Sequence, residues 1–516
     1  MLTLSPKTVY SIRSRMPPPA SEYLQAFLSK DARFDGRFVA GVTTTHVYCK
    51  SSCPAKKPAA ENIVFFDTPA DAEAAGFRAC RKCRPEVTLG TPASKGTSTT
   101  VSRALRLIED GVLDHANIDA LCERLGIGAR QLRRLFNKHL GTSPVQVALV
   151  RRARFARSLI ETTSLSMAHI AEAAGFGSVR RFNSVINDFY GCPPTALRKM
   201  PNRIAGELEL QIPVEGQFPW VRMLQFLEPW TASGVEQVAG ERYYRTVSFG
   251  KVAGEICVTY EPDAGALRVR ASSSLGAHLL DVVSGVRRLF DVDAQTSAIA
   301  EHLSTDPVLD RCIRATPGLR VPGAFDHFET AVMMLLNQHI RPEEASELMD
   351  RIVEKYGKRI ETSQPSLTHV FPTPYALSTA RLEAVGVPKR RSRSIQALAR
   401  AVHEGALRLD GSPSLEAAVE GLCSIADVSA TTAQYVAMRV YREPDAFPSN
   451  SHWLRKAISD NGAPAPVSDL EIRADAWRPW RAYAAMHLWD SFFADEPDAR
   501  LLWDRASTPP RADQVA

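Results

Sequence analysis

The chain has 516 residues, of which 45% are hydrophobic, and a formal net charge of +6. This length predicts about three to four domains with compact cores, and no apolar run approaches the roughly 20 residues that a membrane-spanning helix needs. Nine cysteines without a secretory h-region indicate a reducing environment rather than a disulfide framework. We therefore expect a multidomain protein of the cytoplasm that is not inserted in a membrane.

The first 19 residues are expected to form a flexible tail, and four cysteines with distinctive spacing follow. Cys49, Cys53, Cys80 and Cys83 stand as C-x3-C, 26 residues, then C-x2-C. Two close thiol pairs at this separation can surround one soft metal ion, and four sulfurs in a tetrahedron suit structural zinc. The spacing predicts one Zn²⁺ held by all four thiolates. The flanking residues are basic: Lys50, Lys56, Lys57, Arg78, Arg81, Lys82 and Arg84. The metal is therefore either purely structural or holds a nucleophilic thiolate that faces DNA phosphate.

The stretch FDGRFVAGVTTTHVYCKSSCPAKKPAAENIVFF, followed by AEAAGFRACRKCRPE, resembles the methyl-accepting zinc domain of the Ada adaptive-response regulators. The resemblance covers about residues 30–86. It implies that Cys49 takes a methyl group from a methylated DNA phosphate and that the other three cysteines complete the zinc site. Three positions depart from the commonest family pattern: His46, Lys50 and Ser51 replace a glycine, an arginine and a proline. Lys50 keeps a charge for DNA phosphate but lacks the bidentate fork of arginine.

The residues also predict a switch. Four thiolates around one Zn²⁺ leave a net charge near minus two, which makes the sulfur nucleophilic. Methylation of Cys49 would turn a thiolate into a thioether and remove one negative charge, so affinity for DNA should rise. Because no thiol is regenerated, each molecule should react once.

A polar linker, expected at residues 91–103, precedes a region of helical periodicity that extends to about residue 202. Two helix-turn-helix units are predicted there, with second helices over residues 129–139 and 178–188. The side chains expected to face a groove of DNA are Arg130, Gln131 and Arg134 in the first unit and Ser178, Arg180, Arg181 and Asn183 in the second.

The chain between Arg130 and Arg157 contains no acid. Its further basic residues are Arg133, Lys138, Arg151, Arg152 and Arg154. A solvated basic face and a DNA-binding face both fit this run. The tandem units, with the long helix VQVALVRRARFARSLIE between them, resemble the AraC-type DNA-binding domain. That resemblance implies two recognition helices in successive major grooves of double-stranded DNA, a monomer as the binding species, and RNA polymerase as a further candidate partner.

After residue 205 the pattern alternates apolar and polar residues with turns between, which predicts a small antiparallel sheet flanked by a helix. From about residue 290 to 505 the pattern is almost wholly helical. Four strings carry a resemblance to the AlkA-type 3-methyladenine DNA glycosylases: FLEPWTASGVEQV, GLRVPGAFDHFETAVMMLLNQHI, FPTPYALSTARLEAVGVPKRRSRSI and WRPWRAYAAMHLWD. The resemblance implies a small α+β domain followed by a helix-hairpin-helix domain.

Several departures fall where that family binds DNA and acts on it. The hairpin reads IADVSATTA, with Asp427 and Ser429 at positions that are glycines in the family. Ser451 stands where the family has its catalytic aspartate, and His339 replaces the apolar wedge after Gln338. Tyr435 and Trp489 persist at base-pocket positions, although ordinary core packing also explains them. A hydroxyl cannot offset the developing positive charge on the sugar.

Three hypotheses follow. The first is an alkylation-responsive DNA-binding transcriptional regulator whose glycosylase-like half is impaired in catalysis. The second is a bifunctional repair protein with an active 3-methyladenine-type glycosylase, through a relocated carboxylate or substrate-assisted departure. The third is a regulator with structural zinc only.

The expected fold class is multidomain α+β. The expected parts are a tail (1–19), a zinc domain (20–90), a linker (91–103), an all-α tandem helix-turn-helix domain (104–202), a small α+β domain (206–290), an all-α helix-hairpin-helix domain (291–505) and a tail (506–516).

Overall fold

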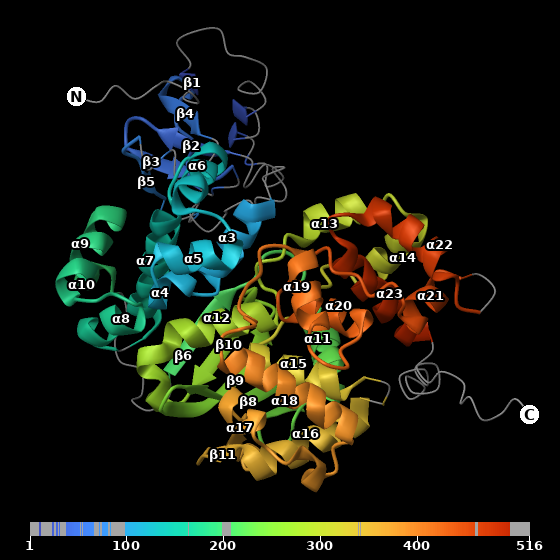
Figure 1. The fold of residues 1–516 in the computed structure, drawn as a ribbon. Helices are drawn as coiled ribbons and strands as arrows, with labels where there is room; N and C mark the ends of the chain where they lie inside the picture. The colour runs from blue at the N-terminus through green and yellow to red at the C-terminus, as the bar shows by residue number, and fades with distance from the viewer. Residues whose placement is uncertain are drawn as a thin grey trace, which may run out of the picture. The chain divides into compact units, whose positions relative to one another are not determined.

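The computed structural model describes residues 10–11, 23–24, 27–28, 30, 38–51, 53, 55–66, 72, 75–80, 83, 99–163, 165–198, 208–338, 340, 342–459 and 463–495. The chain divides into two compact units (Figure 1): unit 1 contains residues 1–123 and 127–201, and unit 2 contains residues 124–126 and 202–516. Four residues singled out in the sequence, Arg81, Lys82, Arg84 and His339, lie outside the described residues. Within the described ranges, no helix combines the length and apolar character needed to cross a bilayer.

Unit 1 begins with a five-stranded sheet in the order β1-β4-β2-β3-β5. Its elements are β1 (Tyr10–Ser11), β2 (Val39–Val42), β3 (Val47–Cys49), the 3-10 turn η2 (Ala60–Asn62), β4 (Ile63–Phe66) and β5 (Arg78–Ala79). Strands β3 and β5 are parallel, with Tyr48 opposite Ala79. Because of this register, Cys49 and Cys80 lie at the same end of neighbouring strands. Phe38 and Phe65 pack edge to face in the core, with ring centroids 5.2 Å apart.

The rest of unit 1 is helical. Its helices are α3 (Thr99–Glu109), α4 (Val112–His115), α5 (Ile118–Leu125), α6 (Ala129–Leu140), α7 (Pro144–Thr162), α8 (Met167–Ala173), α9 (Val179–Tyr190) and α10 (Pro194–Leu197). Helix α3 starts inside the expected linker, because Val101, Ala104 and Ile108 form a buried stripe that begins before residue 104. Figure 1 shows α7 between the two helix-turn-helix units, and both α6 and α9 end on a left-handed glycine, Gly141 and Gly191.

Part of the basic run between the two helix-turn-helix units forms ion pairs within unit 1 instead of a solvated surface. Arg151 and Arg152 both bind the carboxylate of Asp114, with Arg152 Nε 2.7 Å from Asp114 Oδ1. Arg157 binds Glu161 at 3.0 Å. These three arginines are therefore paired within unit 1, and their acidic partners lie outside the acid-free segment.

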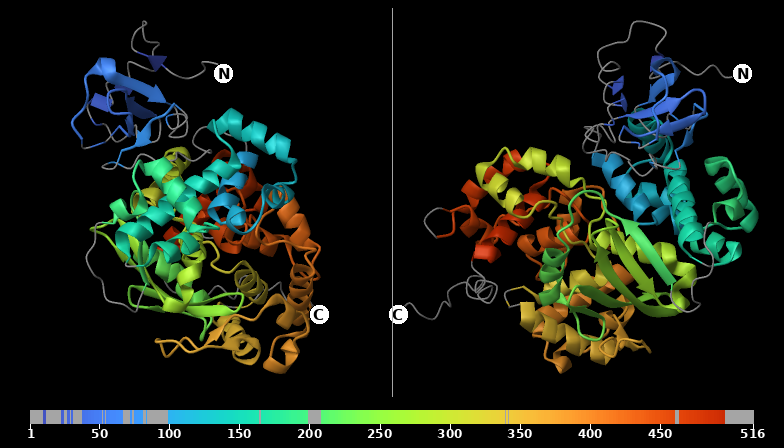
Figure 2. Two further views of the ribbon diagram at one scale, coloured as in Figure 1. Left: turned by 90° about the vertical axis from the view of Figure 1, so that its left-hand side faces the viewer. Right: turned by 180° about the vertical axis from the view of Figure 1, so that it is seen from behind.

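Unit 2 begins with an antiparallel five-stranded sheet in the order β6-β10-β9-β8-β7, which confirms the predicted small sheet. Its elements are β6 (Leu208–Pro213), α11 (Trp220–Leu227), η5 (Glu228–Trp230), β7 (Glu236–Ala239), β8 (Arg242–Phe249), β9 (Val252–Glu261), β10 (Ala266–Ala271) and η6 (Ser273–His278). In β8 Tyr243, Arg245 and Val247 form a buried face, and Thr246 on the opposite face is also buried, where its hydroxyl donates to the His369 carbonyl. Figure 2 shows these strands side by side in green.

The remainder of unit 2 is helical apart from one two-stranded ribbon. Its elements are α12 (Leu279–Leu289), α13 (Thr296–Leu303), α14 (Pro307–Ala315), α15 (His327–Leu336), α16 (Pro342–Tyr356), β11 (Lys358–Arg359), β12 (His369–Val370), α17 (Pro374–Ser378), η7 (Leu382–Val385), α18 (Lys389–His403), α19 (Leu415–Cys423), α20 (Ala430–Arg439), α21 (His452–Ala457), α22 (Val467–Ala474), η8 (Asp475–Trp477) and α23 (Arg481–Asp495). One core cluster of this half packs α15, α16, α18 and α20 together.

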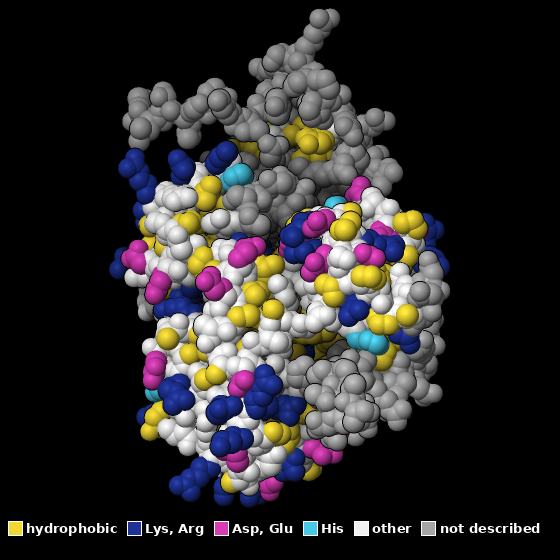
Figure 3. Space-filling view, turned by 45° about the vertical axis from the view of Figure 1, so that its right-hand side comes forward, with side chains coloured by type: hydrophobic (Ala, Val, Ile, Leu, Met, Phe, Trp, Pro, Cys, Tyr) yellow, Lys and Arg dark blue, Asp and Glu magenta, His cyan; other side chains and the backbone are white. Residues whose placement is uncertain are grey.

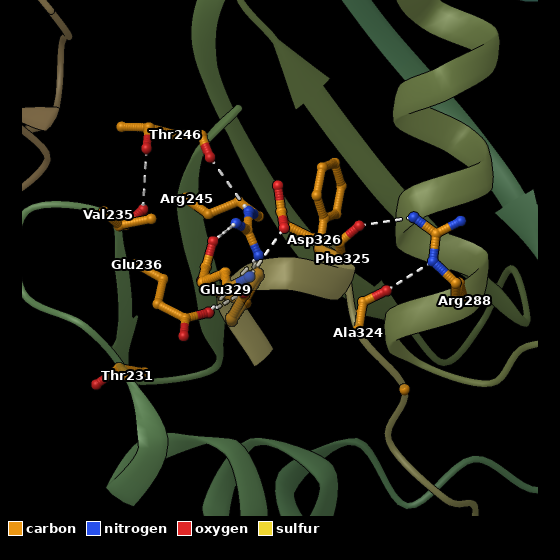
Figure 4. Close-up of polar contacts among 12 residues, drawn as sticks. Thr231, Val235, Glu236, Arg245, Thr246, Arg288, Ala324, Phe325, Asp326 and Glu329 are labelled. Carbon is orange, nitrogen blue, oxygen red and sulfur yellow. Dashed lines mark hydrogen bonds and ion pairs between the residues drawn. The ribbon is translucent and has the colours of Figure 1, made fainter. Parts of the chain in front are cut away.

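The coil that connects α14 to α15 is buried over residues 319–325. Backbone carbonyls in such a coil need partners, because burial without a hydrogen bond is costly. Arg288 donates to the carbonyls of Ala324 (2.7 Å) and Phe325 (2.6 Å), as Figure 4 shows. Arg439 donates to the two preceding carbonyls, those of residues 322 and 323. Two arginine forks therefore satisfy four consecutive carbonyls.

Next to this coil, a buried ion pair joins the sheet to the helices. Arg245 of β8 donates to Glu329 of α15 at 2.8 Å, and its guanidinium lies 4.3 Å from the centroid of the Phe325 ring. Burial raises the pKa of Glu329, and the guanidinium of Arg245 opposes that rise.

We expect Arg288→Met to destabilise unit 2 by about 2–6 kcal/mol, because two buried carbonyls lose their donors at roughly 1–3 kcal/mol each. All seven tryptophans follow residue 202, so denaturation monitored by tryptophan fluorescence reports on this unit alone. The matched control is Arg268→Met on β10. Arg268 pairs with Glu261 at a partly exposed site, and its loss should cost less than about 1 kcal/mol. Equal losses in the two variants would contradict the role given to Arg288.

Candidate functional site

The four cysteines of unit 1 converge on one point. Their sulfur atoms all lie within 4.8 Å of one another, and Cys53 Sγ lies 3.9 Å from Cys80 Sγ. A tetrahedron with Zn–S bonds of about 2.3 Å has edges of about 3.8 Å. All four side chains are buried. The donor set and its spacing therefore fit one Zn²⁺, and Cys49, Cys53, Cys80 and Cys83 are the residues that would hold it.

Backbone geometry places these ligands. The parallel pairing of β3 and β5 is extended by a bond from the Cys80 amide to the Tyr48 carbonyl (3.0 Å). His46 lies in the turn before β3 with φ +49°, a left-handed conformation that favours glycine. This explains why the family pattern has a glycine where this chain has His46.

One basic side chain is fixed beside the thiols. Lys57 Nζ donates to the Ser51 carbonyl (2.8 Å) and lies 3.6 Å from the centroid of the Phe27 ring. Burial lowers the pKa of Lys57, and the neighbouring cysteines oppose that shift. The ammonium group therefore lies where it can offset negative charge on the sulfurs.

Hydrogen bonding with Cys80 and Cys83, and then burial, raise the pKa of the Cys49 thiol. Crowding four thiols together therefore does not by itself yield a thiolate. A bound divalent cation reverses this and keeps the sulfurs deprotonated. Cys49 is 7% exposed, so only a small part of it can meet a reactant.

The predicted groove-facing residues lie on the exposed sides of the two second helices. Arg130, Gln131 and Arg134 are exposed on α6, while Leu132 and Phe136 of the same helix are buried. Helix α9 repeats this arrangement: Arg180, Arg181 and Asn183 are exposed, and Ser178 caps the helix by accepting from the Arg181 amide.

Unit 2 contains a cavity of about 400 Å³. The structure brings Gln338, Tyr435, Ser451 and Trp489 together in its wall, although they come from four separate segments. The rings of Tyr435 and Trp489 are stacked, with centroids 5.7 Å apart and planes inclined by 17°. Such a pair presents a π surface suited to a flat, electron-poor ring.

Ser451 lies at the start of α21 and is 6% exposed. The Tyr435 hydroxyl donates to Ser451 Oγ at 3.3 Å. Burial raises the pKa of Tyr435 to about 12, so its phenol stays neutral near neutral pH. The position where the glycosylase resemblance predicts a carboxylate therefore carries two neutral hydroxyl groups.

The cavity also contains a carboxylate that the sequence did not single out. Asp490 lies in the wall next to Trp489 in sequence. It accepts a hydrogen bond from Thr316 Oγ1 (2.6 Å), and Arg222 Nε lies 3.7 Å from its Oδ1. Asp490 follows Trp489 directly in the string WRPWRAYAAMHLWD, which is the one signal that points to it.

The hairpin between α19 and α20 keeps its turn without glycine. Asp427 adopts φ +64°, and Ser429 caps α20 by accepting from the Thr432 amide (3.2 Å). Aspartate tolerates the left-handed region better than most residues. The Asp427 carboxylate binds Arg390 (2.9 Å) and Arg393 (3.5 Å) of α18.

Three parts of the chain match known families. Residues 22–86 match the metal binding domain of Ada, residues 121–200 a helix-turn-helix domain, and residues 209–326 the AlkA N-terminal domain. A relative from two strains of Mycobacterium tuberculosis, named "Probable bifunctional transcriptional activator/DNA repair enzyme AlkA", is 38% identical over 474 residues, which is 90% of this chain and 95% of the relative.

Two relatives from Escherichia coli match separate parts. "DNA-3-methyladenine glycosylase 2" is 29% identical over 277 residues, covering 53% of this chain and 93% of that protein. "Bifunctional transcriptional activator/DNA repair enzyme Ada" is 31% identical over 157 residues, covering 30% of this chain and 43% of that protein.

A tetrathiol metal site, paired recognition helices and an aromatic cavity beside a helical hairpin define a multidomain DNA-binding protein of alkylation response and repair. The mycobacterial relative matches 90% of this chain and 95% of its own length at 38% identity, which shows the family to which the chain belongs. The chain belongs to the AlkA/Ada family of bifunctional transcriptional activator/DNA repair proteins.

We expect the purified protein to carry one zinc ion per chain, and Cys80→Ser to lose most of it because a structural site needs all four ligands. Zinc content measured by elemental mass spectrometry checks this. Cys122→Ser is the matched control, since Cys122 is also buried but lies outside the cluster. Loss of zinc in both variants, or in neither, would show that the four cysteines are not the ligand set.

Proposed function

We propose that this protein is an alkylation-responsive transcriptional regulator in which Cys49 accepts a methyl group from a DNA methylphosphotriester. The observation that carries the proposal is the cluster of four cysteine sulfurs within 4.8 Å of one another, in the same chain as tandem helix-turn-helix units. Family membership supports the proposal, because each of these relatives is named as both a transcriptional activator and a DNA repair enzyme.

In the proposed step, the Cys49 sulfur attacks the methyl carbon of the phosphotriester. A sulfur–carbon bond forms, the carbon–oxygen bond breaks, and the electron pair leaves with the phosphate oxygen to restore an ordinary phosphodiester. The phosphotriester is uncharged, so it does not repel an electron-rich sulfur. The bound metal would keep the sulfur a thiolate, so no separate base is needed. Cys49 ends as a thioether.

The proposed signal is electrostatic. The thioether carries one negative charge fewer than the thiolate, so Lys50 and Lys57 beside the site attract DNA phosphate more strongly. Promoter contacts would then come from Arg130, Arg134 and Gln131 on α6 and from Arg180, Arg181 and Asn183 on α9. Two recognition helices in one chain let a monomer bind, and RNA polymerase is the partner that an activator at a promoter would meet.

We expect Cys49 to gain one methyl group when the protein is incubated with duplex DNA that carries methylphosphotriesters. Peptide mass spectrometry locates the group, and its yield should not exceed one per chain because no thiol is regenerated. Cys122 provides the internal control and should stay unmodified. An unmodified Cys49 in zinc-loaded protein would contradict methyl transfer and leave a regulator with structural zinc only.

We further propose that the cavity of unit 2 binds alkylated bases of DNA but that the bond between the base and its sugar is cleaved slowly there. Base release needs a charge that offsets the oxocarbenium-like sugar, and Ser451 supplies a hydroxyl instead. Loss of a single stabilising group of this kind costs about 10²–10³ in rate. The stacked Tyr435 and Trp489 would still hold a cationic base.

One observation favours a second candidate, an active 3-methyladenine-type glycosylase. Asp490 places a carboxylate in the wall of the same cavity, and its hydrogen bond from Thr316 orients it. A cationic alkylated base is a good leaving group, so a displaced carboxylate would suffice for release. In this candidate Asp490 supplies the negative charge that Ser451 cannot supply.

We expect the wild-type protein to release little free 3-methyladenine from methylated duplex DNA, and Ser451→Asp to raise the rate by at least about tenfold. Chromatography of the released base checks this. Ser449→Asp is the matched control: it adds the same charge to the same turn, where Ser449 is bonded to Glu471. Efficient release by wild type that is abolished in Asp490→Asn would instead establish the second candidate.

A further inference from the structure

The first turn of α18 carries positive charges that are unfavourable for the stability of the helix. Lys389, Arg390 and Arg391 occupy its first turn, which contains no acid. The amino end of a helix has a partial positive charge, so each cation there costs a few tenths of a kcal/mol. Figure 3 shows Lys and Arg side chains gathered low on one face, at the height at which Figure 1 draws α16, α17 and α18.

Two arginines of α18, Arg390 and Arg393, are joined to the hairpin by exposed contacts. Arg390 and Arg393 bind the Asp427 carboxylate, although their side chains are 70% and 61% exposed. Ion pairs this exposed contribute about 0–1 kcal/mol to stability. Stabilisation of the fold therefore does not explain this cluster of Arg390, Arg393 and Asp427. One carboxylate shared by two guanidinium groups leaves one positive charge over, and much of each planar fork remains open to solvent.

The cluster adjoins the cavity. Arg391 donates to the backbone carbonyl of Gln338, which lies in the cavity wall. Ser429, two residues after Asp427, lies in the same wall together with Thr431 and Thr432. A nucleotide whose base occupies the cavity keeps its phosphates outside, and the neighbouring phosphates of that strand follow every few ångströms.

We infer that Arg390 and Arg393 form a phosphate clamp for the DNA strand whose nucleotide enters the cavity, with Asp427 as the positioning residue that holds their forks beside the hairpin. The Asp427 carboxylate alone would repel a phosphate, whereas the two guanidinium groups that it holds offer exposed donors beside the hairpin. Arginine suits this role because its planar fork matches phosphate bidentately. The clamp requires neither methyl transfer to Cys49 nor release of the base.

The test uses the full zinc-loaded chain and two short duplexes of identical sequence, one with a stable abasic-site analogue and one undamaged. Binding is measured by fluorescence anisotropy between about 50 and 200 mM salt. The ratio of the two affinities cancels the contribution of the helix-turn-helix units, which both duplexes share. For Arg390→Gln/Arg393→Gln we expect the ratio to fall at least about tenfold. The salt slope for the abasic duplex should decrease by about two, one for each lost phosphate contact.

Two further variants make the result specific. Arg390→Lys/Arg393→Lys keeps both charges and should retain the salt slope while recovering only part of the affinity. Arg314→Gln removes another exposed arginine of unit 2 that pairs with an aspartate, Asp310, and should change neither quantity. An unchanged ratio and slope in Arg390→Gln/Arg393→Gln would overturn the clamp. So would a wild-type protein that does not prefer the abasic duplex, since no nucleotide would then occupy the cavity.

Discussion

The buried coil at residues 319–325 is the constraint on which the architecture of unit 2 depends. A coil has no ladder of its own, so each of its carbonyls must find a donor on another segment. Arg288 of α12 and Arg439 of α20 supply two donors each, to the four carbonyls of residues 322–325. Gly323 has no room for a side chain, because an added Cβ would lie 2.4 Å from the Arg288 carbonyl oxygen. Residues of this coil also line the cavity, so the arginines that satisfy it fix one cavity wall as well.

Residue spacing and apolar periodicity were enough to predict the parts of the fold that depend on residues close together in the sequence. The spacing of Cys49, Cys53, Cys80 and Cys83 needed only the geometry of a tetrahedral metal ion, and the structure gathers these sulfurs. The helix-turn-helix units followed from apolar periodicity, which buries residues such as Phe136 on α6. The alternation of apolar and polar residues after residue 205 likewise predicted the antiparallel sheet that the structure shows.

Partners that are distant in sequence could not be predicted in this way. Nothing in the sequence indicates that Arg151 meets Asp114, that Arg288 serves a coil beyond α14, or that Arg390 meets Asp427, because each pairing depends on tertiary packing. A charged residue in a sequence looks the same whether it faces DNA or a buried carbonyl. The place of Asp490 depends on tertiary packing in the same way, because only the folded chain brings its carboxylate into the cavity wall.

The position of Cys49 has a consequence for how such a protein would measure damage over time. The sulfur lies at the end of β3, 7% exposed, within a cluster of ligands. In the transfer that we propose, it becomes a thioether that has no proton to lose and no thiol to recover. Each molecule would then keep a permanent record of one lesion. The modified fraction would count past events rather than report the current dose, and only synthesis of new protein would reset it.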